Sequence, residues 1–292
     1  MQAHELREYV ASSNKQLRAR SLIAYAQGVL AGRYGLSDAT QAFDLLRGVS
    51  QRRNIKLHQI AAALTSSAPP AGGAQEWFPG RTRTPAPSLR AVTQADLDAG
   101  NLGAVLTAAL ERVLDIVGGQ AGNVQLAEDG ALRLERHHAH PRLFTDYFAF
   151  VDHGTSCSQA AADLRQVTVR NIAEADDIFD DATRQLLLDT GSRACHSVPL
   201  AGPDGTARGV ISSHHVRPLA ELGRNQLEAL EQVQHLMGTY LHWHHHNVVR
   251  DALEDLHRTV LDHAGPRGAV PGARARRTRR DGEDARQADP QG

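Results

Sequence analysis

Apolar residues recur at helical spacing three times in succession between residues 20 and 64, and this pattern restricts that part of the chain to a small helical fold. The apolar positions are Leu22, Ala26, Val29 and Leu30, then Ala42, Phe43, Leu46 and Val49, then Leu57, Ile60, Ala61 and Leu64. Residues three or four apart share one face of a helix, so each stretch predicts an amphipathic helix.

Punctuating residues separate these three helices. Gly35 can end the first helix in a left-handed conformation, Ser37 is the expected N-cap of the second, and Asn54 breaks the second. Three short helices share only a marginal core. We therefore expect the first helix to be long, over residues 4–33, and to pair with a partner chain.

The same part of the chain is basic. Residues 15–64 hold eight basic side chains and two acidic ones, a net charge of +6, whereas the whole chain carries −1. The rest of the chain is therefore acidic overall. A basic module of this size is too small for an enzyme and suits a polyanionic partner.

A stretch rich in proline and glycine follows the helical module. Residues 67–93 lack apolar periodicity, and their Trp77 and Phe78 either dock on a domain surface or act as a hydrophobic tether. The predicted organisation is a helical module over 1–66, a flexible linker over 67–95, a second domain over 96–263 with a long C-terminal helix, and a disordered tail over 264–292.

Helical and strand patterns alternate in the second domain. Helices are expected over residues 102–117, 179–190 and 221–263, a short strand over 167–169, and two hairpins with turns at 128–130 and 202–206. This order predicts an α+β domain with an antiparallel sheet and helices packed on one face. The fold class is thus multi-domain, with an N-terminal all-α three-helix module.

The helical module also matches a known spacing of residues. Its members are Arg20, Ile23, Ala26, Gln27, Gly28 and Leu30, then Ala42, Phe43, Leu46 and Arg47, then Leu57, Ile60 and Ala61. In this the module resembles the ANTAR domain of transcription antitermination regulators. The resemblance implies a module that binds RNA stem-loops in a nascent transcript, usually as a dimer. Gln27 replaces the family's usual lysine, which removes a cation but keeps a hydrogen-bonding side chain.

The resemblance points to Arg20, Gln27, Gly28 and Arg47 as RNA-binding residues. Arg20 precedes Gln27 by seven residues and Gly28 by eight, so these three project from one side of the first helix. We expect Ala26 and Gly28 to leave a low surface that RNA can approach, and the polar side chains to read bases splayed from a hairpin loop. Alternatively, the small residues only permit close helix packing and the arginines solvate a surface.

The second domain resembles a GAF domain in residues 122–151, 154–157 and 191–215. The resemblance implies a sensor with an unidentified small-molecule ligand. Together the two resemblances predict a regulator that couples this sensor to the binding of RNA stem-loops. The long helices further predict a homodimer. The alternative is a small-molecule or redox sensor whose helical module serves only dimerisation.

No other motif indicates catalysis. The sequence lacks the phosphate-binding GxxxxGK[ST] and the hydrolase GxSxG motifs, so we expect neither enzymatic activity nor a cofactor. His242 and His246 have the spacing of metal ligands, but a polar helix face or a dimer seam is preferred to a metal site. Cys157 and Cys195 are interpreted as small buried side chains, with redox sensing as the alternative. The polar N-terminus and the lack of a membrane-spanning apolar run predict a cytoplasmic protein.

Overall fold

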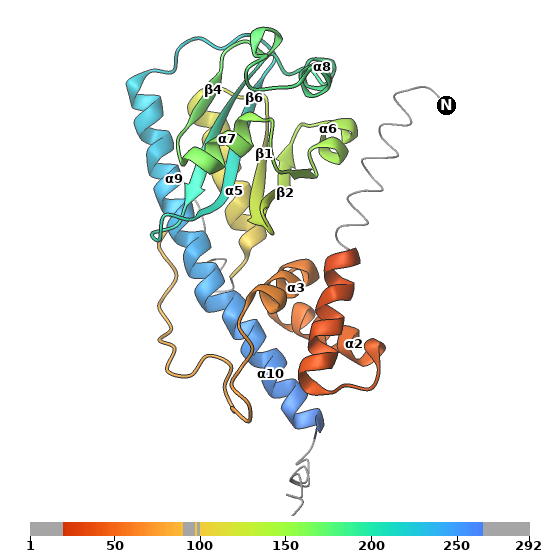
Figure 1. Cartoon of the computed structure of the whole chain (residues 1–292). Helices are drawn as coiled ribbons and strands as arrows, with labels where there is room; N and C mark the ends of the chain where they lie inside the picture. Colours follow the sequence, from red (N-terminus) through yellow and green to blue (C-terminus); the bar gives the residue numbers. More distant parts are fainter. Residues whose placement is uncertain (1–19, 90–96, 98–99, 265–292) are drawn as a thin grey trace, which may run out of the picture.

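The computed structural model describes residues 20–89, 97 and 100–264, which form a helical part and a sheet-containing part along one long helical segment (Figure 1). The helical part contains a helix over residues 20–34, α2 (Ala39–Arg53) and α3 (Leu57–Ser66). The three predicted helices are therefore confirmed. The predicted start of the first helix at residue 4 lies outside the described residues, as does the predicted tail from residue 265.

Local chemistry sets the ends of these helices. Gly35 and Asn54 adopt positive φ angles of 63° and 50° and end the first helix and α2, as predicted. The N-cap of α2 is Asp38 and not Ser37, because the Asp38 carboxylate accepts a hydrogen bond from the Thr40 backbone N–H at 2.8 Å. A carboxylate at this position also interacts favourably with the helix dipole.

The second domain is built on a six-stranded antiparallel sheet with the order β3-β2-β1-β6-β5-β4. The strands are β1 (Ala121–Glu128), β2 (Ala131–His138), β3 (Phe150–Val151), β4 (Val167–Val169), β5 (Ala194–Ala201) and β6 (Ala207–His215). Both predicted hairpins are confirmed. Asp129 and Gly130, with φ angles of 48° and 77°, form the tight turn between β1 and β2.

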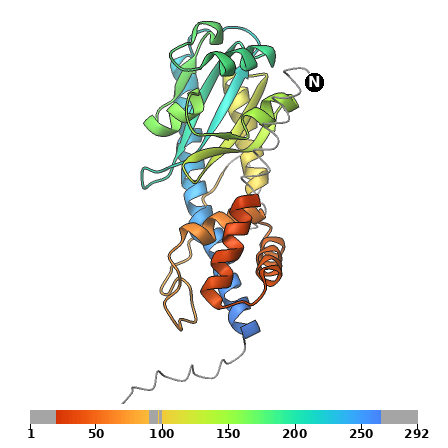
Figure 2. The same ribbon diagram turned by 45° about the vertical axis from the view of Figure 1, so that its right-hand side comes forward.

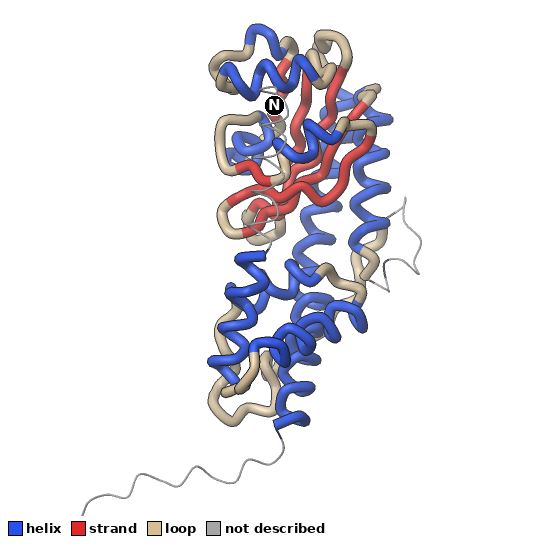
Figure 3. The backbone as a smooth tube through the Cα atoms, turned by 90° about the vertical axis from the view of Figure 1, so that its right-hand side faces the viewer, coloured by secondary structure: helices blue, strands red, loops and turns tan. Residues whose placement is uncertain are grey.

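Helices cover both faces of this sheet, so the prediction that they pack on one face is wrong (Figure 3). One face carries α5 (Leu102–Val117) and α9 (Arg224–His244); the other carries α6 (Arg142–Tyr147), α7 (Ser156–Asp163), the 3-10 turn η1 (Ile172–Glu174) and α8 (Asp181–Asp189). Successive strand residues point to opposite faces. Leu200 and Ile211 accordingly join the core under α5 and α9, whereas Cys195 and Val210 join the core under α7.

The predicted helix over 221–263 is a continuous segment of α9, a π-helical turn η2 (His245–Val249) and α10 (Arg250–Ala264). It runs from the sheet along the helical part (Figure 2). The predicted domain limits assign this segment wholly to the second domain, whereas α10 packs on the N-terminal helices. Its contributions to their core are Ala252, Leu253, Leu256 and Val260.

Trp77 connects the predicted linker to this helical core. Its side chain is 4% exposed and packs within the core that α10 completes. The backbone N–H groups of Trp77 and Phe78 donate to the Glu254 carboxylate at 3.0 and 2.7 Å. These contacts favour the docking interpretation of Trp77 over the tether. Among the helices of the described ranges, none has both the length and the hydropathy to cross a membrane.

Candidate functional site

The four residues predicted to bind RNA lie on the surface of the helical part. Arg20 and Gly28 are exposed and Gln27 is half-buried on the first helix, while Arg47 is exposed on α2. A Cβ atom built on Gly28 would meet no atom within 4 Å, so the helix is open at that point. In the described part of the chain no hydrogen bond or ion pair joins any two of the four.

Ala26 does not share this open surface. It is fully buried in the core with Leu30, so the prediction that Ala26 and Gly28 form one low surface is wrong. Two residues along a helix are separated by about 200° around its axis, which puts Gly28 opposite Ala26. Tyr25, which the sequence pattern did not single out, has a side chain that is 65% exposed, one helical turn before Gly28. Its position off the stripe of Ala26 and Leu30 was the signal that could have found it.

Several arginines of the helical module make contacts within the chain. The guanidinium of Arg33 lies 4.9 Å from the centre of the Trp77 ring, and Arg53 pairs with Asp255 of α10 at 2.5 Å. Arg52 donates to the Thr259 hydroxyl at 3.3 Å. Arg20 and Arg47 take part in no such contact among the described residues, so they remain the best placed for an external anion.

A group of charged side chains joins the helical part to the β1–β2 hairpin. It consists of Lys56 and His58 at the start of α3 with Glu128, Arg133 and Glu135 of the hairpin, and we call it the Glu135 cluster. Glu135 Oε1 lies 2.9 Å from His58 Nε2, and Glu135 Oε2 pairs with Lys56 Nζ. Burial alone would raise the pKa of Glu135, but His58 and Lys56 lower it to about 2. Glu135 is therefore ionised at neutral pH.

A cavity of about 250 Å³ lies next to the Glu135 cluster. Its lining comes from both parts of the molecule and includes Gln59 and Ala63 of α3, Glu128 and Glu135 of the hairpin, and His244 at the end of α9. Apart from the long helix, the helical part and the β1–β2 hairpin thus meet through the polar contacts of the Glu135 cluster, beside this cavity.

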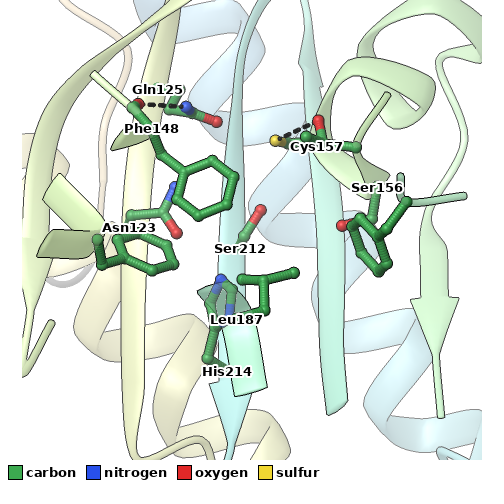
Figure 4. A pocket seen from close by; sticks show the side chains of 11 residues that line it. Asn123, Gln125, Phe148, Ser156, Cys157, Leu187, Ser212 and His214 are labelled. Atoms are coloured by element: carbon green, nitrogen blue, oxygen red, sulfur yellow. Dashed lines mark hydrogen bonds between the residues drawn. The ribbon is translucent and has the colours of Figure 1, made fainter. Parts of the chain in front are cut away.

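A second, much smaller cavity lies on the α7 face of the sheet (Figure 4). Its volume is about 20 Å³, room for a single water molecule. Asn123 and Gln125 of β1 line it together with Ser212 and His214 of β6, Phe148 and Cys157. Among the residues that the structure describes, the buried side-chain oxygens of Asn123 and Gln125 have no hydrogen-bond partner, so they are free to bind a small polar group.

Family comparisons agree with this division of the molecule. An ANTAR domain model matches residues 12–64, and a GAF domain model matches residues 101–241. The chain carries an ANTAR domain followed by a GAF domain. The six-stranded antiparallel sheet and its helices are the GAF domain, and the smaller cavity lies inside it.

The GAF region is also similar to solved structures. A GAF domain/HD domain protein from Geobacter sulfurreducens shares 12% identity over 49% of this chain and 91% of its own, with a TM-score of 0.40. A type II free methionine-R-sulfoxide reductase from Thermoplasma acidophilum shares 16% identity over 46% of this chain and 88% of its own, with a TM-score of 0.37. No curated protein matches the chain.

The two cysteines of the GAF domain are buried free thiols. Burial raises the pKa of Cys157, and it raises that of Cys195 to about 12. Because the thiolate is the reactive form, these environments suit packing better than redox chemistry. Cys195 Sγ lies 3.4 Å from the Ser156 hydroxyl, which belongs to a chain of buried hydroxyls that continues through Ser197 to Ser212.

The histidines at the end of α9 pack against one another. The rings of His242 and His246 stack with centroids 4.0 Å apart, and burial lowers the pKa of His245 to about 4. Within the described residues, no group of three or more His, Cys, Asp or Glu side chains is placed to hold a metal ion. This stretch includes the η2 turn, where the helix leaves the GAF domain for the ANTAR domain.

Proposed function

We propose that this protein is a transcription antitermination regulator in which the GAF domain senses a small molecule and controls the binding of RNA stem-loops by the ANTAR domain. The observation that carries the proposal is the helical segment shared by both domains. Leu230 and Tyr240 of α9 are buried in the GAF core, whereas Leu253 and Leu256 of α10 are buried in the ANTAR core. We propose that a rearrangement in one core is transmitted to the other along this continuous helical segment.

The small GAF cavity is the proposed place for the signal. It is lined by polar side chains of β1 and β6, and α9 covers the opposite face of the same sheet. Because the cavity now has room for about one water molecule, a larger ligand must displace α6, α7 or α8 to enter. We propose a regulatory role without catalysis for this site.

We also propose that Arg20, Gln27, Gly28 and Arg47 form the RNA-binding surface, and that the protein acts in the cytoplasm as a homodimer. Exposure of Arg20, Gly28 and Arg47 supports the surface. The dimer rests on the resemblance to regulators that bind paired stem-loops. The length of the C-terminal helix is a weaker argument for a dimer, because α10 packs on the ANTAR helices of its own chain.

A gel-shift titration of the full-length protein with an RNA of two tandem stem-loops tests this proposal. Arg20→Ala and Arg47→Ala should each cost about 1 to 3 kcal/mol of binding free energy, because each removes a cation from the RNA surface. Arg224→Ala, which removes a highly exposed arginine at the start of α9, is the matched control.

Unchanged binding by both ANTAR variants would reject the proposed surface. The competing function is a sensor whose ANTAR domain only dimerises. It would be favoured if the wild-type protein sediments as a dimer and binds none of a set of tandem stem-loop RNAs with different loop sequences.

A further inference from the structure

The Glu135 carboxylate bridges two side chains of the ANTAR domain, the ammonium group of Lys56 and the imidazole of His58. One carboxylate oxygen accepts from His58 Nε2 at 2.9 Å, and the other pairs with Lys56 Nζ. A phosphate group of RNA also has anionic oxygens that can bridge two nitrogen donors in this way. The side chains of Glu135 and His58 are only 3% and 8% exposed, so an external anion cannot reach His58 while the hairpin stays in place.

The contact that covers His58 can open without exposing the ANTAR core. Among the described residues, the ANTAR core includes side chains of the three N-terminal helices, Trp77, η2 and α10. It includes none from the strands of the GAF sheet. The cavity of about 250 Å³ separates α3 from the hairpin beside the Glu135 cluster. Moving the hairpin away from α3 would leave the ANTAR core covered. It would break the ion pairs of the Glu135 cluster, a cost that an RNA phosphate offsets when it takes the place of the Glu135 carboxylate.

We propose that Lys56 and His58 form a phosphate-binding pair of the ANTAR domain, masked in this conformation by Glu135 of the GAF domain. RNA and the β1–β2 hairpin then compete for the same two side chains. The inference rests on the proposed function and adds two residues to the RNA surface. It also gives the GAF domain a direct means of control, since binding of RNA at this pair and docking of the hairpin exclude each other.

Strand β1 connects the masked pair to the sensor cavity. Asn123 and Gln125 line the small GAF cavity, and Glu128, at the end of the same strand, lies 3.8 Å from His58. A ligand that hydrogen-bonds the unpartnered oxygens of Asn123 and Gln125 acts on the strand that carries part of the mask. Strand β1 thus contributes Asn123 and Gln125 to the proposed signal site and Glu128 to the contact with His58.

The test is an RNA-binding and salt titration of the full-length Glu135→Gln protein. Phosphate contacts carry no sequence information, so one RNA of two tandem stem-loops is a sufficient probe. Removing the competing charge should raise RNA affinity by about 5- to 50-fold. It should also steepen the slope of log K against log salt concentration by about one to two, because one or two more phosphates are neutralised. Glu111→Gln, an exposed substitution of the same kind on α5, is the control and should change neither.

Two further variants tie the effect to the proposed pair. Adding Lys56→Gln to Glu135→Gln should remove about one unit of the salt slope and most of the gain in affinity. Hydrogen exchange without RNA should show faster exchange in α3 and the β1–β2 hairpin of the Glu135→Gln protein. Lys56 is half-exposed, so its substitution should add no loss of stability to that of Glu135→Gln, and a difference between the single and double variants reports on the Lys56 cation.

The outcomes separate this inference from the proposed function. If Arg20→Ala weakens RNA binding but Glu135→Gln leaves the affinity and the salt slope unchanged, the masked pair is rejected and the RNA-binding function stands. If neither the wild-type protein nor any variant binds RNA, both are rejected. A slope that does not respond to Lys56→Gln in the Glu135→Gln protein overturns the phosphate assignment.

Discussion

Single side chains decide what the first helix presents to a partner. Ala26 and Gly28 are both small, yet Ala26 is fully buried and Gly28 faces open space. Glycine in the middle of a helix costs stability because its backbone loses more freedom on folding than that of any other residue. Nothing in the packing around Gly28 requires it, so its proposed use is the approach of RNA to the backbone.

Gly28→Ala should therefore separate stability from function. We expect the free energy of unfolding to rise by about 0.5 to 1 kcal/mol, since alanine is the better helix former and its methyl group meets no neighbour. We expect RNA affinity to fall, because the methyl group keeps RNA from the helix surface. Thermal denaturation and gel-shift titration measure the two effects. A variant that is stabilised and binds RNA as well as wild type would show that Gly28 has no part in the interface.

For single residues, the sequence predicts positions on one helix but not contacts between residues that are far apart in the chain. Helical spacing places Arg20, Gln27 and Gly28 on the first helix, and it could also have placed Tyr25. It could not pair His58 with Glu135, which lies 77 residues further on, or bring Trp77 to Glu254 across 177 residues. Those contacts exist only after the two domains and the long helix have assembled.

At the scale of helices and strands, α9 packs unusually close to the backbone of β5. A Cβ atom built on Gly238 would lie 2.6 Å from the carbonyl carbon of Ala201 and 3.1 Å from its nitrogen. The helix can reach the sheet at this point only because residue 238 has no side chain. Sequence patterns predicted both elements but not this contact, since a glycine within a helix gives no indication of its neighbour.

Gly238→Ala should destabilise the protein although alanine is the better helix former. The gain in helix propensity is about 1 kcal/mol. Steric overlap with the β5 backbone, which cannot give way as a flexible side chain could, displaces α9 and costs more than this gain, up to about 3 kcal/mol. Chemical denaturation measures the net loss. Gly32→Ala is the matched control, because a Cβ atom there meets nothing within 4 Å and should stabilise its helix. Equal effects of the two substitutions would contradict the close packing of α9 on β5.

At the scale of the whole molecule, the two domains meet through the long helix and the Glu135 cluster. The cores on either side are separate, with α9 contributing to one and α10 to the other. The sequence predicts two domains from a break in periodicity, and the comparisons confirm an ANTAR and a GAF domain. It could not predict that α10 completes the ANTAR core, because the helical pattern runs through both regions without a break.

The Glu135 cluster makes the stability of the assembled protein sensitive to acid. The pKa of Glu135 is lowered from 4.5 to about 2 in the folded protein, so its stabilising contribution is fully present above about pH 4.5 and is lost as the pH falls toward 2. The loss is on the order of 3 kcal/mol. Denaturation of wild type and Glu135→Gln between pH 6 and pH 2.5 measures it. The two should converge at the acidic end, and parallel profiles would show that Glu135 contributes no pH-dependent stability.

The π-helical turn η2 lies where the long helix passes from one domain to the other. Such a turn holds one residue more than an α-helical turn. The turn therefore absorbs a residue that a regular α-helix would accommodate only by rotating everything beyond it by about 100°. The buried faces of α9 and α10 stay directed at the GAF core and the ANTAR core on either side of it. In evolution, one residue inserted into the regular part of either helix, where no such turn absorbs it, would rotate the RNA-binding and sensing domains against each other by about 100°.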